Sequence, residues 1–300
     1  MKKIVVAGVM VMAFGLFEGC FARQDAYTFS VFTQDKKPKP ELQRLLTLTG
    51  VTHEDSISSI VNATQKAWLR KPGTERWHMS AVCLENEDAV WGQLRAMGFI
   101  DTVVPAKKSY RYLVVLGSLF DSVKLRFKNA IECIKERDVT VEKIVFLVGN
   151  RPCVADQGEN EEAFKKFAPD LEVMPKDEYD MAKLVYEVMA DDDIKQIPVS
   201  FVCAPMKKTA DGRLTRPTTQ DTIELWIEQE DIESGSCLVV SSQPFVRYQD
   251  SVVKTYVPKE IEVETIGQIS KRAEELAVVL DTVARYLYQE KIRLEQEEKK

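Results

Sequence analysis

Residues 110–127, YRYLVVLGSLFDSVKLRF, limit the possible folds of this chain more than any other segment. Their apolar run, residues 112–116, has the length of a buried strand and stops at Gly117 and Ser118. A helical pattern follows over residues 122–135, with its apolar residues on one face. A strand, a tight turn and a helix in this order form the opening unit of a βα-type sheet.

Strand-like runs then alternate with helical patterns. Strands are predicted at residues 112–116, 143–148, 199–203 and 237–241, with a weaker run at 261–264. Helices are predicted between them at residues 122–135, 161–167, 178–190, 220–228 and 245–255. Such alternation produces a mostly parallel sheet with right-handed crossovers. The predicted fold class is therefore α/β, with helices on both faces of the sheet.

The first 22 residues are predicted to be a secretory signal peptide. Lys2 and Lys3 precede an apolar run that is short for a membrane span, and small residues follow it. Cleavage after Ala22 would release an exported chain, in the periplasm or associated with the cell envelope. The alternative is a lipoprotein signal in which Cys20 is acylated and anchors the chain to a membrane.

Two further segments flank the α/β core, which we place at residues 110–266. Residues 23–109 are expected to form a helical cap, with helices near 41–48, 55–69 and 85–97 and a stop at Gly98. Residues 267–300 are expected to form a long helix, about 268–295, and a charged tail. We expect this helix to pack on the sheet edge; self-association through its apolar stripe is the alternative.

Composition excludes several classes of function. The net charge of −6 argues against binding a nucleic acid polymer. The only histidines, His53 and His78, precede the core, so the core contains no Ser-His-Asp triad. The scattered cysteines and few histidines predict no metal site. The lack of a G-x-G-x-x-G turn and of a P-loop argues against ordinary dinucleotide or ATP binding.

Polar residues follow each predicted strand, where parallel sheets bind their ligands. The candidate ligand-binding residues at these turns are Gly117, Ser118, Arg126, Gly149, Asn150, Arg151, Ser242, Gln243 and Arg247. Side chains that converge from separate turns are what a pocket in this architecture requires.

The loop at residues 204–219, APMKKTADGRLTRPTT, carries four positive charges in an otherwise acidic protein. Its Asp211-Gly212 pair predicts a hairpin over the site. Thr218 and Asp221 match a capping box at the start of the next helix. Arg216, Thr219, Thr222 and free N–H groups at that helix start would suit a phosphate, carboxylate or sulfate; a solvated loop with an ordinary cap is the alternative.

Acid–base chemistry in the core would depend on carboxylates, because the core has no histidine. Glu178 and Asp221 are the candidate catalytic residues, and Asp180 is a candidate ligand-binding residue. All three lie at predicted helix starts, where carboxylates also serve simply as caps.

The order of these segments resembles a known family. VVLGS with a following arginine, FLVG, EYDMAKLV, RPTTQDTIELW and VVSSQPFVRYQ are similar to the YdcF/ElyC/SanA-like family, a domain of unknown function, over roughly half the chain. The resemblance implies a Rossmann-like fold, a link to the bacterial envelope and, for one branch, S-adenosylmethionine binding. It assigns site roles to Gly117, Arg126, Gly149, Glu178, Thr219, Thr222 and Arg247. The chain differs from the pattern at Asp221 and Tyr248, which identifies it as a divergent member.

The sequence therefore predicts an exported protein that binds a small anionic ligand, phosphorylated or nucleotide-like, in envelope biogenesis or maintenance. If it is an enzyme, transfer or hydrolysis on a phosphorylated envelope precursor is the expected reaction. The alternatives are a non-catalytic scaffold of the envelope and an enzyme that uses S-adenosylmethionine, the latter by family analogy alone.

Overall fold

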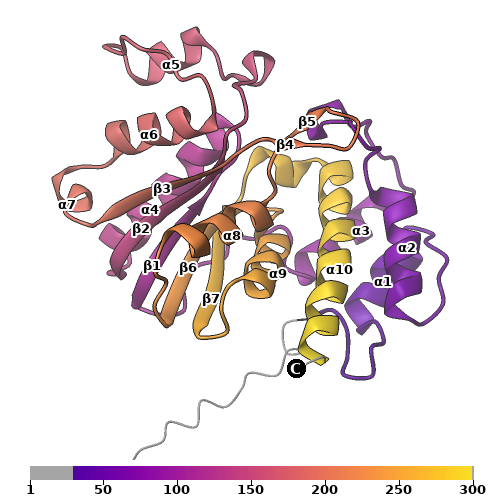
Figure 1. Cartoon of the computed structure of the whole chain (residues 1–300). Helices are drawn as coiled ribbons and strands as arrows, with labels where there is room; N and C mark the ends of the chain where they lie inside the picture. Colours follow the sequence, from indigo (N-terminus) through magenta and orange to yellow (C-terminus); the bar gives the residue numbers. More distant parts are fainter. Residues whose placement is uncertain (1–29, 299–300) are drawn as a thin grey trace, which may run out of the picture.

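A parallel sheet forms the centre of the molecule, shown in Figure 1 by a computed structural model that describes residues 30–298. The predicted signal peptide and Cys20 lie outside the described residues. Five strands, all parallel, follow the order β3-β2-β1-β6-β7. They are β1 (Ser109–Leu116), β2 (Thr140–Gly149), β3 (Val199–Ala204), β6 (Gly235–Ser242) and β7 (Ile261–Gln268). The α/β fold class is confirmed, and the sheet is Rossmann-like.

Helices cover both faces of this sheet. One face packs against α4 (Phe120–Glu136) and α6 (Glu178–Met189), the other against α8 (Thr219–Gln229) and α9 (Val246–Tyr256). Successive strand side chains point to opposite faces, so residues 112–116 of β1 alternate between the two cores. The winding of the chain reverses between β1 and β6. Ligands bind at such a switch point in open α/β sheets.

Both ends of the described chain build the helical cap. The helices α1 (Pro40–Leu48), α2 (Ile57–Trp68) and α3 (Glu87–Ala96) share one apolar cluster with α10 (Leu276–Glu298). Figure 1 shows α10 between α9 and the N-terminal helices. The expectation that this helix packs on the sheet edge is therefore wrong, because α9 separates it from the sheet.

The start of α10 also differs from the expectation. The helix begins at Leu276 rather than near Gln268, because Gln268 is the last residue of β7. A 3-10 turn, η3 (Lys271–Glu274), connects the two elements. Along α10, fifteen residues are buried, on more than one side of the helix. This burial follows from its position between two packed layers.

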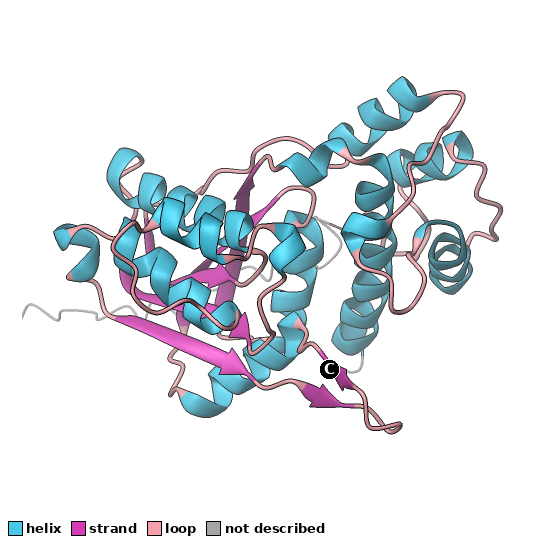
Figure 2. Ribbon diagram, turned by 90° about the horizontal axis from the view of Figure 1, so that it is seen from above, coloured by secondary structure: helices cyan, strands magenta, loops and turns pink. Residues whose placement is uncertain are grey.

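The predicted hairpin is confirmed. After β3, the short strands β4 (Lys207–Lys208) and β5 (Leu214–Thr215) pair antiparallel around a turn in which Gly212 has φ of +82°. The hairpin extends from the sheet toward the cap, as Figures 1 and 2 show from two directions. It brings the residues that follow it to the junction of cap and core.

The remaining helices are short. They are α5 (Glu161–Phe167), α7 (Asp192–Lys195), η1 (Arg76–His78) and η2 (Ala155–Gln157). Across residues 30–298, we find no helix with the length and apolar character needed to cross a bilayer. The five cysteines in this range are free thiols.

Candidate anion-binding site

A cavity of ≈ 330 Å³ lies between the carboxyl ends of β1 and β2 and the helical cap. Its lining is rich in cations. The charged residues are Arg70, Glu75, Arg76, Arg126, Arg151, Glu178, Arg216 and Arg272. Six arginines against two glutamates give the cavity an excess of positive charge, which is attractive to an anion.

Arg126 is the most deeply buried cation of this lining that forms no ion pair with a described carboxylate. It extends from α4, and its Nη1 donates to the carbonyl oxygens of Leu116 (2.9 Å) and Gly117 (2.6 Å). The residue is only 3% exposed, and its Nε has no hydrogen-bond partner. Burial lowers the pKa of Arg126 to about 10, while nearby Glu178 opposes this shift. The group remains charged at neutral pH, and its Nε donor is unpaired.

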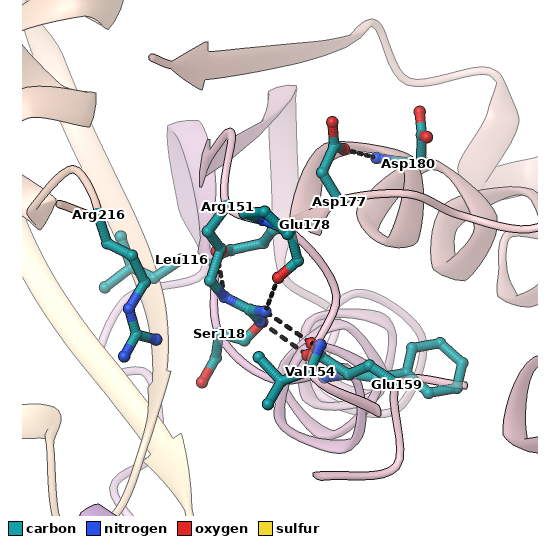
Figure 3. Close-up of polar contacts among 12 residues, drawn as sticks. Leu116, Ser118, Arg151, Val154, Glu159, Asp177, Glu178, Asp180 and Arg216 are labelled. Atoms are coloured by element: carbon teal, nitrogen blue, oxygen red, sulfur yellow. Dashed lines mark hydrogen bonds and ion pairs between the residues drawn. The ribbon is translucent and has the colours of Figure 1, made fainter. Parts of the chain in front are cut away.

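Arg151 and Glu178 form the opposite part of the inner wall, with Glu159 behind them (Figure 3). Arg151 binds both oxygens of Glu159, at 2.6 and 2.7 Å, and its Nε lies 3.0 Å from Oε2 of Glu178. Glu159 also accepts the N–H of Phe120 at the start of α4. Arg151, a candidate ligand residue, is thus occupied by internal ion pairs. Its evident role is to position Glu178.

Glu178 is a buried carboxylate in contact with the cavity, 7% exposed. Burial raises its pKa to about 7, although the positive charge of Arg151 opposes the change. A group with this pKa can both accept and release a proton at neutral pH, which is the property required of a general acid or base.

Gly117 and Gly149 make room for this carboxylate at the strand ends. A Cβ atom on Gly117 would overlap Oε1 of Glu178, and one on Gly149 would lie 2.6 Å from Cγ of Pro217. The absence of side chains at these two positions lets the helix start and the hairpin loop approach the ends of β1 and β2.

The start of α8 forms another part of the wall. Thr218 caps the helix through the predicted capping box, and Thr219 and Thr222 line the cavity. The first N–H groups of a helix have no intrahelical partner. Arg216 precedes this start, forms an ion pair with Glu75 of the cap and lies 6.0 Å from the ring centre of Trp77. This contact joins the hairpin to the cap at the cavity.

Arg70 and Arg76 form the cap side of the lining and share one carboxylate. Asp281 of α10 is fully buried and lies 3.5 Å from Nη1 of Arg70 and 3.7 Å from Nε of Arg76. It is closer to Arg285, whose Nε is at 3.0 Å. Arg76 also stacks over the ring of Phe245, 4.5 Å from its centre. One negative charge therefore positions three guanidinium groups.

The structure brings nine of the candidate residues together at the cavity: Gly117, Ser118, Arg126, Gly149, Arg151, Glu178, Arg216, Thr219 and Thr222. The other six do not line it: Asn150, Asp180, Asp221, Ser242, Gln243 and Arg247.

Two of these six candidates are carboxylates at helix starts. Asp221 accepts from the N–H and hydroxyl of Thr218 and pairs with Lys207 at 2.7 Å. Burial opposes its ionisation, but these contacts hold the pKa of Asp221 below its usual value. Asp180 accepts the N–H of Lys176, and Figure 3 shows it pointing away from Arg151. Both carboxylates serve the local structure.

Three more candidates lie near the joint between core and cap. The amide of Gln243 donates to the carbonyl oxygens of Gly98 (3.2 Å) and Asp101 (2.6 Å). The guanidinium of Arg247 packs so closely on Gly98 that a Cβ there would lie 2.7 Å from its Nε. Ser242 reaches the site only indirectly, through a 3.4 Å contact with Arg126. Asn150, the sixth, is exposed.

Sequence reasoning missed the contribution of the cap, which consists of Arg70, Glu75, Arg76 and Trp77, and it missed Tyr248 of α9. In the sequence, the one sign of this contribution is that basic and aromatic residues are grouped within residues 70–77, between two predicted helices. His78, in the same segment, is exposed and does not line the cavity. Nowhere in residues 30–298 do three or more His, Cys, Asp or Glu residues gather in a way that could hold a metal ion.

Fold and cavity together define a Rossmann-like α/β protein with an arginine-rich site at the strand ends. No family model matches the chain. It is 25% identical over 221 residues to an uncharacterized protein of Mycobacterium bovis and, equally, to uncharacterized proteins of two Mycobacterium tuberculosis strains. The match covers 65% of this chain and 60% of the length of these curated relatives.

Proposed function

We propose that this protein binds a small anionic ligand, phosphorylated or nucleotide-like, in the cavity between its sheet and its helical cap. The observation that carries the proposal is Arg126, a buried guanidinium that lines the cavity with an unpartnered Nε. Leaving a buried charged donor unsatisfied is costly, so a bound anion would recover free energy at this position.

The surroundings of Arg126 support an oxyanion. Helices α4 and α8 both begin at the cavity, and helix starts attract anions through their N–H groups and dipoles. The same lining disfavours S-adenosylmethionine, because its sulfonium cation would face six arginines. We place the ligand in the biogenesis or maintenance of the cell envelope, on the strength of the predicted signal peptide and the resemblance to YdcF-like proteins.

A catalytic role is a second candidate function, and one observation favours it. Glu178 contacts the cavity, and burial raises its pKa to about 7, with Arg151 opposing the shift. It would then move a proton during transfer or hydrolysis on a phosphorylated envelope precursor. Arg126 would hold the negative charge of the substrate near this carboxyl group.

Calorimetric titration of the protein with inorganic phosphate tests the binding function. Arg126→Gln removes the charge and is expected to weaken binding about tenfold to a hundredfold, as for other charge-assisted hydrogen bonds. Arg126→Lys keeps the charge and should retain part of the affinity. Arg111→Gln is the matched control, because Arg111 lies on β1 but pairs at the surface with Glu142 and Glu233.

Circular dichroism of each variant shows whether the fold is retained. If the wild-type protein binds neither phosphate nor pyrophosphate, or if Arg126→Gln binds the anion as tightly as the wild type, the proposal is rejected.

A further inference from the structure

The cavity has arginine side chains with unsatisfied donors on two walls. Three arginine nitrogens in residues 30–298 are buried without a hydrogen-bond partner: Nε of Arg126, Nη1 of Arg70 and Nε of Arg76. All three arginines line the same cavity. Arg126 belongs to the core wall, at the end of β1, whereas Arg70 and Arg76 belong to the cap wall. One cavity therefore has a cationic position on each side.

Asp281 does not satisfy the cap wall. It is 3.5 Å from Nη1 of Arg70 and 3.7 Å from Nε of Arg76, distances that allow charge attraction but form no hydrogen bond there. Its short contacts, both 3.0 Å, go to the backbone N–H of Arg70 and to Nε of Arg285 on its own helix. Asp281 thus orients Arg70 and Arg76 and leaves donors of both unused.

The two glutamates of the lining are also committed elsewhere. Glu178 pairs with Arg151 at 3.0 Å, and Glu75 pairs with Arg216. Neither forms an ion pair with Arg126, Arg70 or Arg76 among the described contacts. Each wall therefore keeps an excess of positive charge that an anionic ligand would balance.

We propose that the ligand carries two anionic groups, of which a diphosphate is the simplest case, and that it spans the two walls. One group binds Arg126 at the end of β1, and the other binds Arg70 and Arg76 on the cap. The cavity volume of ≈ 330 Å³ is within the range of small-molecule sites and accommodates more than a single phosphate. This inference rests on the proposed function and narrows it to a class of ligand.

The test compares inorganic pyrophosphate with inorganic phosphate by calorimetric titration, with divalent cations removed by a chelator. Pyrophosphate is expected to bind one per chain and at least about tenfold more tightly than phosphate, since it engages both walls. Fructose 1,6-bisphosphate, with a wider spacing between its phosphates, is measured in parallel. Tighter binding of either compound supports a ligand with two anionic groups.

Single substitutions distinguish the contribution of the cap wall to binding from that of the core wall. Arg76→Gln should reduce pyrophosphate affinity about tenfold or more, toward that of phosphate, and change phosphate affinity by less than about threefold. Arg70→Gln, a second cap-wall variant, should act in the same direction if Arg76→Gln fails to fold. Arg285→Gln is the matched control, because it contacts the same Asp281 without lining the cavity, and pyrophosphate affinity should stay within about threefold.

Two results would overturn the inference and leave the proposed function standing. In one, phosphate binds through Arg126 but neither pyrophosphate nor the bisphosphate binds more tightly. In the other, pyrophosphate binds more tightly, yet Arg70→Gln and Arg76→Gln leave its affinity unchanged. If neither phosphate nor pyrophosphate binds, both the inference and the proposed function are rejected.

Discussion

The two walls of the cavity are built in different ways. The core wall is mainly backbone: the ends of β1 and β2, two glycines and two helix starts, with Arg126 anchored on carbonyl oxygens. The cap wall is mainly side chains, oriented by one buried carboxylate on α10. The geometry of the parallel sheet fixes the shape of the core wall. The arrangement of the arginines on the cap wall depends instead on the single charge of Asp281.

This difference implies that the walls respond differently to substitution. A change on the cap wall should alter stability and leave the position of Glu178 intact. A change on the core wall should alter the protonation or placement of Glu178 and leave the cap helices intact.

The largest effect is expected from Asp281→Asn, which removes the charge that orients Arg70, Arg76 and Arg285. Removing one partner of a buried ion cluster leaves uncompensated charge and should lower the free energy of unfolding by about 3–5 kcal/mol, measured by urea denaturation. Asp250→Asn is the control, since it breaks only a partly exposed pair with Lys254 and should cost less than about 1 kcal/mol. Equal losses in the two variants would contradict the central role of Asp281.

Glu178→Gln should change the pH dependence of stability. Burial raises the folded pKa of Glu178 from 4.5 to about 7, with Arg151 opposing the shift, so the folded protein holds a proton that the unfolded chain releases. The free energy of unfolding that Glu178 contributes is therefore lost as pH rises from about 4.5 to 7. The loss is at most about 3 kcal/mol. The difference between wild-type and Glu178→Gln unfolding free energies, measured from pH 4 to 8, should show this decline. A flat difference would place the Glu178 pKa near its ordinary value.

Gly117→Ala tests the backbone character of the core wall. The added Cβ would overlap Oε1 of Glu178 and lie 3.0 Å from the carbonyl oxygen of Leu147, so we expect a loss of about 1–3 kcal/mol. Gly92→Ala is the control: Gly92 lies inside α3 with open space at its Cβ, and the change should stabilise the protein by about 1 kcal/mol. The stability of both variants is measured by thermal unfolding. A Gly117→Ala protein as stable as the wild type would contradict the close packing of Glu178 on Gly117.

Much of the core wall could be predicted from the chain alone. Apolar runs of strand length alternate with helical patterns, and the carboxyl ends of parallel strands meet at one edge of a sheet. That rule was enough to bring Gly117, Gly149 and Arg216 to one cavity. It could not separate Glu178, which faces the cavity, from Asp180 two residues later, which serves the helix start. Glu178 and Asp180 lie on different sides of the first turn of α6, and only the side of Glu178 faces the strand ends.

The cap wall could not be predicted, for a physical reason. Arg70 and Arg76 are brought to the cavity by a carboxylate more than two hundred residues away in the chain. That carboxylate, Asp281, lies in the mostly apolar first part of α10, residues 276–284. Local patterns contain no information about such a contact. Arg247 illustrates the same limit: it follows a strand end as expected, but docking of the cap directs it onto Gly98.

The placement of α10 has a consequence for synthesis of the protein. Ribosomes release α1, α2 and α3 long before α10, yet these helices share their apolar cluster with it. The sheet, residues 109–268, is complete earlier and can fold first, because domains generally fold as units during translation. The apolar surface that the N-terminal helices bury against α10 therefore stays exposed until the last residues emerge. The ligand cavity closes only then, so a prematurely terminated chain would retain the sheet but present an aggregation-prone surface in place of a binding site.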